Sequence, residues 1–285
     1  MRVIFVPVAD RPECAISLQT AFALGQKLGA NVNGCHIRPH RRSDIALPAG
    51  LGSLDSNDAA WESAWRGEKT QKQSDAAKAL FAKVSESHGY SLINKPVSAP
   101  GSIWQEKVGS PDKVLSIMGP VSDMIIVSRP AAKGGKIAGM FLLAALMNSS
   151  RPVLVLPQSG KKTVGQRISI AWNQTAEAAK AVSAAMPLLQ LADQVNIITC
   201  GPEAGLGPKS SQLATYLRYW GVKSKRVRAS GSDDARALTK AFKDTKSDLL
   251  VMGAYSRSRL RQRFFGGVTD HMLHRANIPV LMLHS

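Results

Sequence analysis

Apolar residues follow two alternating patterns along the chain. Short runs such as DMIIV (123–127) and DLLVM (248–252) predict buried strands. Longer segments between such runs, for example residues 13–29, carry apolar residues at spacings of three and four, which predicts amphipathic helices. The pattern therefore predicts strands and helices in alternation along the whole chain.

The alternation occurs twice. PVLVL (152–156) and PVLML (279–283) both begin with Pro-Val, and Gly139 and Gly266 each lie thirteen residues before that proline. This matched spacing indicates an internal repeat. The first repeat predicts strands at 2–8, 31–37, 91–97, 123–127 and 152–156, with helices at 13–29, 69–89, 101–119 and 137–147. The second predicts strands at 167–172, 194–200, 222–228, 248–252 and 279–283, with helices at 175–192, 209–221, 232–244 and 268–276.

Local signals mark several helix ends. Gly29 is expected to cap the end of the first helix, and Thr175 the start of its counterpart in the second repeat. Pro187 predicts a kink or an early end of that second helix, and Pro111 is expected to break the regularity of the helix at 101–119.

Each repeat has the order βαβαβαβαβ, which predicts an α/β fold. We expect two tandem, open, parallel, five-stranded Rossmann-like units with helices on both faces and right-handed crossovers. The polar stretch 158–166 predicts a boundary between a first domain at 1–158 and a second at 166–285. The two Pro-Val strands are expected to pair within the chain, which would relate the domains by a pseudo-twofold. Residues 41–61 have no clear period and predict a long loop.

Composition restricts the class of protein. No apolar stretch reaches the ~20 residues of a membrane helix, and the first residues lack a signal-peptide pattern, so a cytoplasmic location is expected. The three cysteines, Cys14, Cys35 and Cys200, form no CxxC pair and are expected to be buried, inert thiols. The net charge of +17 favours a negatively charged partner without selecting one.

Motifs for catalysis are missing from the sequence. It contains neither GxSxG nor HExxH, and KGGKIAG (133–139) lacks the spacing of a Walker A loop. His271 and His274 lie three residues apart with no evident third ligand, so no metal site is predicted. We therefore expect no enzyme, or at most slow ATP hydrolysis.

The loop after DLLVM has a distinctive glycine spacing. Gly253 is followed by Ser256 after two residues, then by Gly266 after nine more, and then by Gly267. With the double βαβαβαβαβ order, this stretch resembles a tandem universal stress protein of the UspA-like kind. Nucleotide-binding members of that family carry glycine at the position of Ser256, and serine or threonine at the position of Gly267. The chain keeps the spacing and departs at these two residues.

The resemblance implies a nucleotide site in the second domain. In the family this loop wraps the phosphates of ATP, and the ends of the first and second strands contact the adenosine. The family's first-strand aspartate corresponds to Asn173 in the second repeat and to Asp10 in the first. The implied ligand is ATP or another adenine nucleotide, with or without Mg²⁺, acting in a stress response. The expected binding residues are Ala171, Trp172, Asn173, Cys200, Met252, Gly253, Ser256, Arg257, Gly266, Gly267, Val268 and Thr269.

The first repeat has a degenerate version of the loop. Residues 128–140 lack the leading glycine, and the distance from Asp to Pro is 29 residues (123 to 152) rather than 31 (248 to 279). The second domain is therefore the better candidate.

The residues also predict phosphate binding without the resemblance. Gly266 and Gly267 precede a helix, whose N-terminus offers free N–H groups and partial positive charge. Ser256 and Thr269 can add hydroxyl donors, and Arg257 can add a guanidinium fork. A plain basic strand–loop–helix junction is the alternative interpretation.

A second hypothesis stays open for the whole protein. The chain would be a stress-related interaction module that has lost nucleotide binding and uses its basic surface to bind an acidic partner or RNA. Nucleic acid is not expected as the main partner, because the strands lack the aromatic pattern of RNA-reading sheets. A homodimer is compatible with the sequence, and a membrane partner is not expected.

Overall fold

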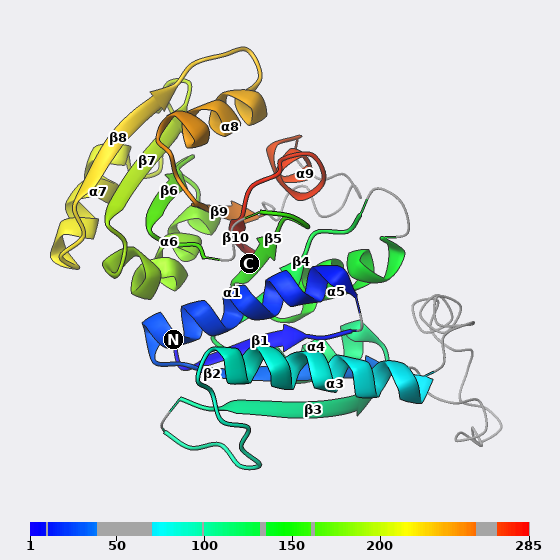
Figure 1. The fold of residues 1–285 in the computed structure, drawn as a ribbon. Helices are drawn as coiled ribbons and strands as arrows, with labels where there is room; N and C mark the ends of the chain where they lie inside the picture. Colours follow the sequence, from blue (N-terminus) through cyan, green and yellow to red (C-terminus); the bar gives the residue numbers. More distant parts are fainter. Residues whose placement is uncertain are drawn as a thin grey trace, which may run out of the picture. The chain divides into compact units, whose positions relative to one another are not determined.

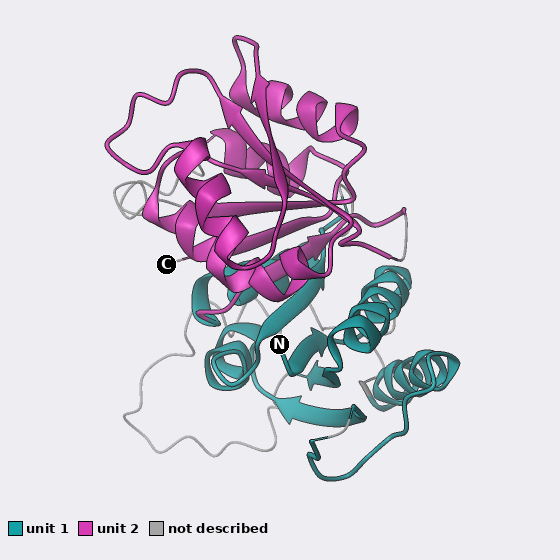
Figure 2. Ribbon diagram, turned by 90° about the vertical axis from the view of Figure 1, so that its left-hand side faces the viewer, with its two compact units in different colours: residues 1–149 teal, residues 150–285 magenta. Residues whose placement is uncertain are grey.

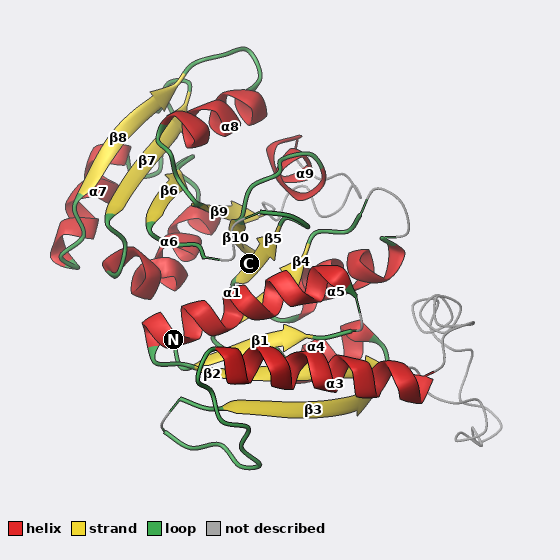
Figure 3. Ribbon diagram, viewed as in Figure 1, coloured by secondary structure: helices red, strands yellow, loops and turns green. Residues whose placement is uncertain are grey.

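The computed structural model describes residues 1–9, 11–38, 70–98, 100–131, 135–160, 163–254 and 267–284. Contacts divide the chain into two compact units, Met1–Ser149 and Ser150–Ser285 (Figure 2). Asp10 and the predicted loop at 41–61 lie outside the described residues. Each unit is an α/β structure with a predominantly parallel sheet, as the alternation predicts (Figure 3).

The first unit contains a parallel four-stranded sheet in the order β3-β2-β1-β4 (Figure 1). Phe5, Phe22 and Phe81 are fully buried in its core. Its elements are β1 (Val3–Pro7), α1 (Pro12–Leu28), β2 (Asn31–Arg38), α3 (Thr70–Ser87), β3 (Ser102–Val108), α4 (Pro111–Met118), β4 (Met124–Ser128) and α5 (Lys136–Asn148).

The predicted third strand of the first repeat is wrong. Residues 91–97 form only an isolated bridge at Leu92, and the strand is β3, which lies inside the helix predicted at 101–119. Pro111 does not interrupt that helix: it is the first residue of α4, where its missing N–H costs no hydrogen bond. The pairing of β3 with β2 supplies hydrogen bonds that the local pattern does not reveal.

The second unit has six strands in the order β5-β10-β9-β6-β7-β8. All of its pairs are parallel except β5–β10. Its elements are β5 (Val153–Leu156), β6 (Arg167–Ala171), α6 (Ala176–Gln190), β7 (Gln194–Cys200), α7 (Ser210–Tyr219), β8 (Ser224–Ala229), α8 (Asp234–Asp244), β9 (Leu249–Ala254), α9 (Gly267–His274) and β10 (Val280–His284).

The two Pro-Val strands pair with each other, as predicted. β5 and β10 are antiparallel, with Leu154 opposite Leu281 and Val155 opposite Val280. β5 thus belongs to the first repeat in sequence and to the second unit by its contacts. The predicted domain limits, 1–158 and 166–285, describe the sequence repeat and stay a prediction.

The aspartates that introduce β4 and β9 fix the start of a neighbouring strand. Asp248 accepts hydrogen bonds from the backbone N–H groups of Gly165, Gln166 and Arg167 at 2.9 to 3.1 Å. Asp123 accepts the corresponding bonds from Arg2 and Val3 at the start of β1. The same device in both units explains the Asp-introduced apolar runs of the sequence.

The predicted helix caps are confirmed. Gly29 has a left-handed conformation with φ of 60° at the end of α1. The Thr175 hydroxyl accepts a hydrogen bond from the Ala178 N–H at the start of α6. α6 does not end early at Pro187 but continues to Gln190.

Candidate functional site

A cavity of about 400 Å³ lies in the second unit, beyond the carboxyl ends of β6, β7 and β9. The first turns of α6, α8 and α9 complete its wall. The lining residues are Ala171, Trp172, Asn173, Thr175, Glu177, Ile198, Cys200, Asp234, Leu238, Met252, Gly253, Ala254, Gly267, Val268 and Thr269.

The strand order explains why a cavity forms here. From β6 the chain moves to β7 and β8 on one side, and it returns to β9 and β10 on the other. The connections after β6 and β9 therefore separate at a topological switch point. Open α/β sheets bind ligands in the crevice at such a point.

Every predicted binding residue that the structure describes lines this cavity. These nine residues come from three separate strand ends and from the start of α9. They are Ala171, Trp172, Asn173, Cys200, Met252, Gly253, Gly267, Val268 and Thr269. The other three predicted residues, Ser256, Arg257 and Gly266, lie outside the described residues.

Gly253 has a packing function at the end of β9. A Cβ at this position would lie 2.6 Å from both the Ala178 nitrogen and the Glu177 carbonyl carbon. Only glycine therefore allows α6 to approach β9 this closely, as one glycine does in dinucleotide-binding folds. A Cβ at Gly267, in contrast, would meet nothing within 4 Å.

Sequence analysis missed two acidic residues of the cavity, Glu177 and Asp234. Both lie in the first turn of a helix, α6 and α8 respectively. Acidic residues are favourable there for any helix because of its dipole, so their sequence positions gave no indication of a cavity. Thr175, Ile198, Leu238 and Ala254 also line the cavity without having been predicted.

Asn173 is held by the helix that follows it. Its side-chain oxygen accepts hydrogen bonds from the Thr175 hydroxyl at 2.9 Å and from the Thr175 N–H at 3.4 Å. The Thr175 hydroxyl in turn accepts from the Ala178 N–H at 3.2 Å. The amide of Asn173 is thereby oriented at the edge of the cavity.

Hydrogen bonds join the segment after β7 to the segment after β6. Gln174 has a left-handed backbone with φ of 64°, and its side-chain amide donates to the carbonyl oxygens of Gly205 and Gly207. A Cβ at Gly207 would lie 1.9 Å from the Gln174 carbonyl oxygen, so a side chain cannot fit there. Trp172 lies two residues before Gln174. Its indole N–H donates to the carbonyl oxygen of Pro208, next to Gly207. These bonds fix the wall next to Trp172 and Asn173.

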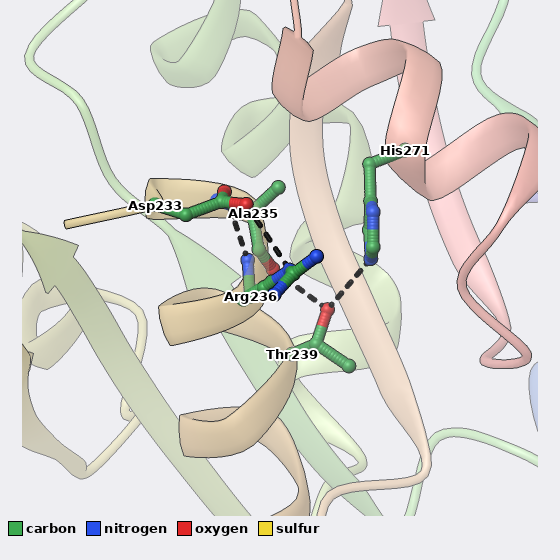
Figure 4. A network of polar contacts seen from close by, with 5 residues as sticks. All are labelled: Asp233, Ala235, Arg236, Thr239 and His271. Atoms are coloured by element: carbon green, nitrogen blue, oxygen red, sulfur yellow. Dashed lines mark hydrogen bonds and ion pairs between the residues drawn. The ribbon is translucent and has the colours of Figure 1, made fainter. Parts of the chain in front are cut away.

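The helices α8 and α9 are also connected (Figure 4). Asp233 caps α8 by accepting hydrogen bonds from the N–H groups of Ala235 and Arg236. One turn further on, the Thr239 hydroxyl lies 3.4 Å from Nε2 of His271 in α9. Because α8 carries Asp234 and α9 carries Thr269, this contact ties two walls of the cavity together.

Burial shapes the titratable groups around the cavity. Burial is the main cause that raises the pKa of the Cys200 thiol, and the charge of Asp234 raises it further. Burial lowers the pKa of His284 at the end of β10, and the charge of Glu177 partly opposes this effect. Cys200 is therefore a neutral thiol at neutral pH.

The first unit has a much smaller cavity at the matching place. Its volume is about 40 Å³, and it lies between the ends of β1 and β4 and the starts of α1 and α5. The strand registers match Ser128 of this unit with Gly253 of the other. The Ser128 hydroxyl donates to the Glu13 carbonyl oxygen and lies 2.6 Å from the Ser17 hydroxyl. At this position the first unit thus carries a hydrogen-bonded serine side chain, whereas the glycine of the second unit lets α6 pack against the strand end.

Within the described part of the chain, no three His, Cys, Asp or Glu residues are grouped to hold a metal ion. His274 lies 3.8 Å from Asp270 on α9. No helix among the described residues is long and apolar enough to cross a membrane.

Comparisons with known proteins agree with this architecture. Residues 165–284 match the model of the Universal stress protein family. A universal stress protein from Archaeoglobus fulgidus DSM 4304 superposes with a TM-score of 0.70 at 14% identity, covering 99% of this chain and 98% of that one. A putative universal stress protein from Pseudomonas aeruginosa UCBPP-PA14 superposes with a TM-score of 0.60 at 15% identity, covering 100% and 93%.

No curated protein matches the chain. At 14% and 15% identity, the two structural neighbours show the fold alone, whereas the family match rests on the sequence of the second unit. Residues 165–284 therefore match the Universal stress protein family, and the whole chain shares its fold with the two structural neighbours.

Proposed function

We propose that the second unit binds an adenine nucleotide, ATP or a close relative, in the cavity at the ends of β6, β7 and β9. The observation that carries this proposal is the convergence of Ala171, Cys200, Met252 and Thr269, from four separate elements, on one cavity. Its volume of about 400 Å³ is within the range of small-molecule sites, about 300–1,000 Å³.

The base would occupy the apolar part of the cavity. Ile198 and Leu238 are buried there, and Ala171 and Met252 lie beside them at two strand ends. An adenine ring buried against such side chains gains from the hydrophobic effect. Asp234, beside Cys200, is suited to accept hydrogen bonds from ribose hydroxyls, a function that acidic residues have in other nucleotide-binding folds.

The phosphates would lie at the start of α9. Gly267 and Val268 begin this helix, whose free N–H groups and positive dipole end favour anions, and Thr269 adds a hydroxyl. Ser256, Arg257 and Gly266 remain predicted contributors to the same phosphate site. Glu177 introduces an opposing charge, so it reduces the affinity for the more highly charged nucleotides.

Nucleotide binding would act as a regulatory signal. A ligand that binds one conformation or assembly state better than another shifts the population toward it. We propose that ATP, with or without Mg²⁺, has this effect on a cytoplasmic stress-response protein, and that the assembly state it controls includes a homodimer.

Titration calorimetry of the purified chain with ATP and Mg²⁺ tests the proposal, together with native mass spectrometry for co-purified nucleotide. Ala171→Phe, which fills the cavity, should abolish the heat of binding while circular dichroism shows a folded protein. Thr269→Val should weaken ATP binding and leave adenosine binding unchanged. Absence of heat with folded wild-type protein at millimolar ATP would refute the proposal.

A further inference from the structure

In one long segment of the second unit, every Asp, Glu, Lys or Arg position is basic. Residues 204–232 contain six Lys or Arg residues and no Asp or Glu. Five of these cations lie on α7, on β8 and between them, and all five are exposed: Arg218, Lys223, Lys225, Arg226 and Arg228. Within the described part of the chain, none of the four from Lys223 to Arg228 forms a side-chain ion pair.

Three aromatic rings accompany these cations. Tyr216, Tyr219 and Trp220, at the end of α7, are 39%, 86% and 47% exposed. The rings of Tyr216 and Trp220 are in edge contact at 6.4 Å, and the Trp220 carbonyl oxygen accepts a hydrogen bond from Gln190 of α6. The backbone under the rings is therefore held in place while their faces stay open to solvent.

β8 is the outer strand of its sheet, since among the described strands it pairs with β7 alone (Figure 1). Lys225 and Val227 share a face with Ile198, which lines the cavity, whereas Arg226 and Arg228 share the opposite face. Right-handed crossovers put α7 on that opposite face. Arg226, Arg228 and the rings of α7 thus share one side of the sheet, at its open edge.

Protection of an edge strand does not explain this surface. Charged residues on edge strands prevent unwanted pairing, but exposed tyrosine and tryptophan rings do not contribute to that. The matching strand of the first unit, β3, carries Glu106 beside Lys107, and its helix α3 exposes no aromatic ring. The fold therefore does not require the basic and aromatic character of the second unit.

We propose that α7 and β8 form a binding surface for single-stranded nucleic acid. A row of cations matches a phosphate backbone, and exposed rings beside it provide faces on which unpaired bases stack. The rings also distinguish this partner from an acidic protein, because stacking needs planar bases. The described strands of this chain lack the exposed aromatic residues of RNA-reading sheets. Here the rings come instead from the helix α7, which lies next to the basic strand β8.

The surface is separate from the nucleotide cavity, since none of its residues lines that cavity. The proposal consequently does not depend on the proposed nucleotide binding.

Fluorescence anisotropy with the full chain and a labelled oligouridine of about 20 nucleotides tests the proposal at several salt concentrations. Wild-type protein should bind, with an affinity that falls steeply as salt rises. Arg226→Glu combined with Arg228→Glu should weaken binding at least about tenfold and make the slope of log affinity against log salt shallower by about 1.4, because each phosphate contact contributes about 0.7. Tyr219→Ser should weaken binding about fivefold or more through lost stacking.

The matched control is Lys72→Glu combined with Lys78→Glu on α3, where both residues are exposed and the net charge changes equally. This variant should bind like wild type. Equal loss in both double variants would overturn the proposal in favour of bulk charge. Equal competition by polyglutamate, by anionic vesicles or by duplex DNA would overturn it as well, as would absence of binding at low salt.

Discussion

The indole N–H of Trp172 donates a hydrogen bond of 2.8 Å to the carbonyl oxygen of Pro208, which joins the segments that follow β6 and β7. Trp172 is almost fully buried, so its N–H has no water to replace this partner. Trp172→Phe should therefore lower the free energy of unfolding by about 1–2 kcal/mol, of which about 1 is the hydrogen bond. Urea denaturation measures the loss, and nucleotide affinity should fall as well. An unchanged denaturation midpoint would show that the bond contributes nothing.

The two glycines of the cavity should respond differently to a methyl group. Gly253→Ala forces a Cβ against the backbone of Glu177 and Ala178, and overpacking of this kind costs about 1–3 kcal/mol. Gly267→Ala meets open space and should leave stability unchanged within about 0.5 kcal/mol. Thermal or urea denaturation of the pair checks this. Equal losses of stability in the two variants would mean that α6 packs less closely against β9 than the 2.6 Å distances at Gly253 indicate.

Glu177→Gln should increase the affinity for ATP. Glu177 lines the cavity in which the phosphates are proposed to bind, and removing its charge removes a repulsion. The expected gain is about three- to tenfold for ATP, with little change for adenosine, measured by calorimetry. If Glu177→Gln lowers the affinities for ATP and adenosine equally, Glu177 contacts the nucleoside rather than repelling the phosphates.

Cys200 should react slowly with alkylating agents at neutral pH. Its pKa is raised, mainly by burial, so little of the reactive thiolate is present. Mass spectrometry after iodoacetamide treatment should show that Cys200 is modified more slowly than a cysteine in an unfolded peptide. Bound ATP should slow the modification further. Cys35 is the internal control: burial raises its pKa to about 12, and it should stay unmodified with or without nucleotide. Modification of Cys200 at the same rate with saturating ATP would place the ligand elsewhere.

His284 should make the second unit sensitive to mild acid. Its pKa is lowered in the folded chain, so the unfolded chain binds a proton more readily below about pH 6.5. This contribution to stability is present at neutral pH and is lost as pH falls toward the lowered pKa. His284→Gln should flatten the dependence of the denaturation midpoint on pH between about 7 and 5, and an unaltered profile would exclude His284 as its cause.

Much of the fold follows from local sequence signals with clear physical causes. The aspartates at 123 and 248 precede apolar runs, and in the structure each binds the start of the neighbouring strand. The third strand of the first unit could not be predicted in the same way. β3 is an outer strand with exposed Glu106 and Lys107, so it lacks the apolar run of a central strand, and Ile103 and Trp104 fit a helix equally well. Its conformation depends on pairing with β2, which is a tertiary contact.

The candidate site was predictable where it depends on strand ends. The family resemblance placed Ala171, Cys200 and Met252 in the site, at the ends of predicted strands, and all three line the cavity. Glu177 and Asp234 come from helix starts, where an acidic residue has an ordinary explanation, so only the assembled structure shows them facing a cavity. Ser256, Arg257 and Gly266 stay predictions, since they lie outside the described residues.

The antiparallel pairing of β5 with β10 has a consequence for strand exchange. β5 is joined to β10 by backbone hydrogen bonds but to β6 only through the segment 157–166. A shortened protein that began at residue 166 would expose the edge of β10, with Val280 and Leu281 unpaired on that side. Such a fragment would accept a Pro-Val strand donated by another copy. β5 (Val153–Leu156) is thus an integral strand of the second unit rather than a tail of the first.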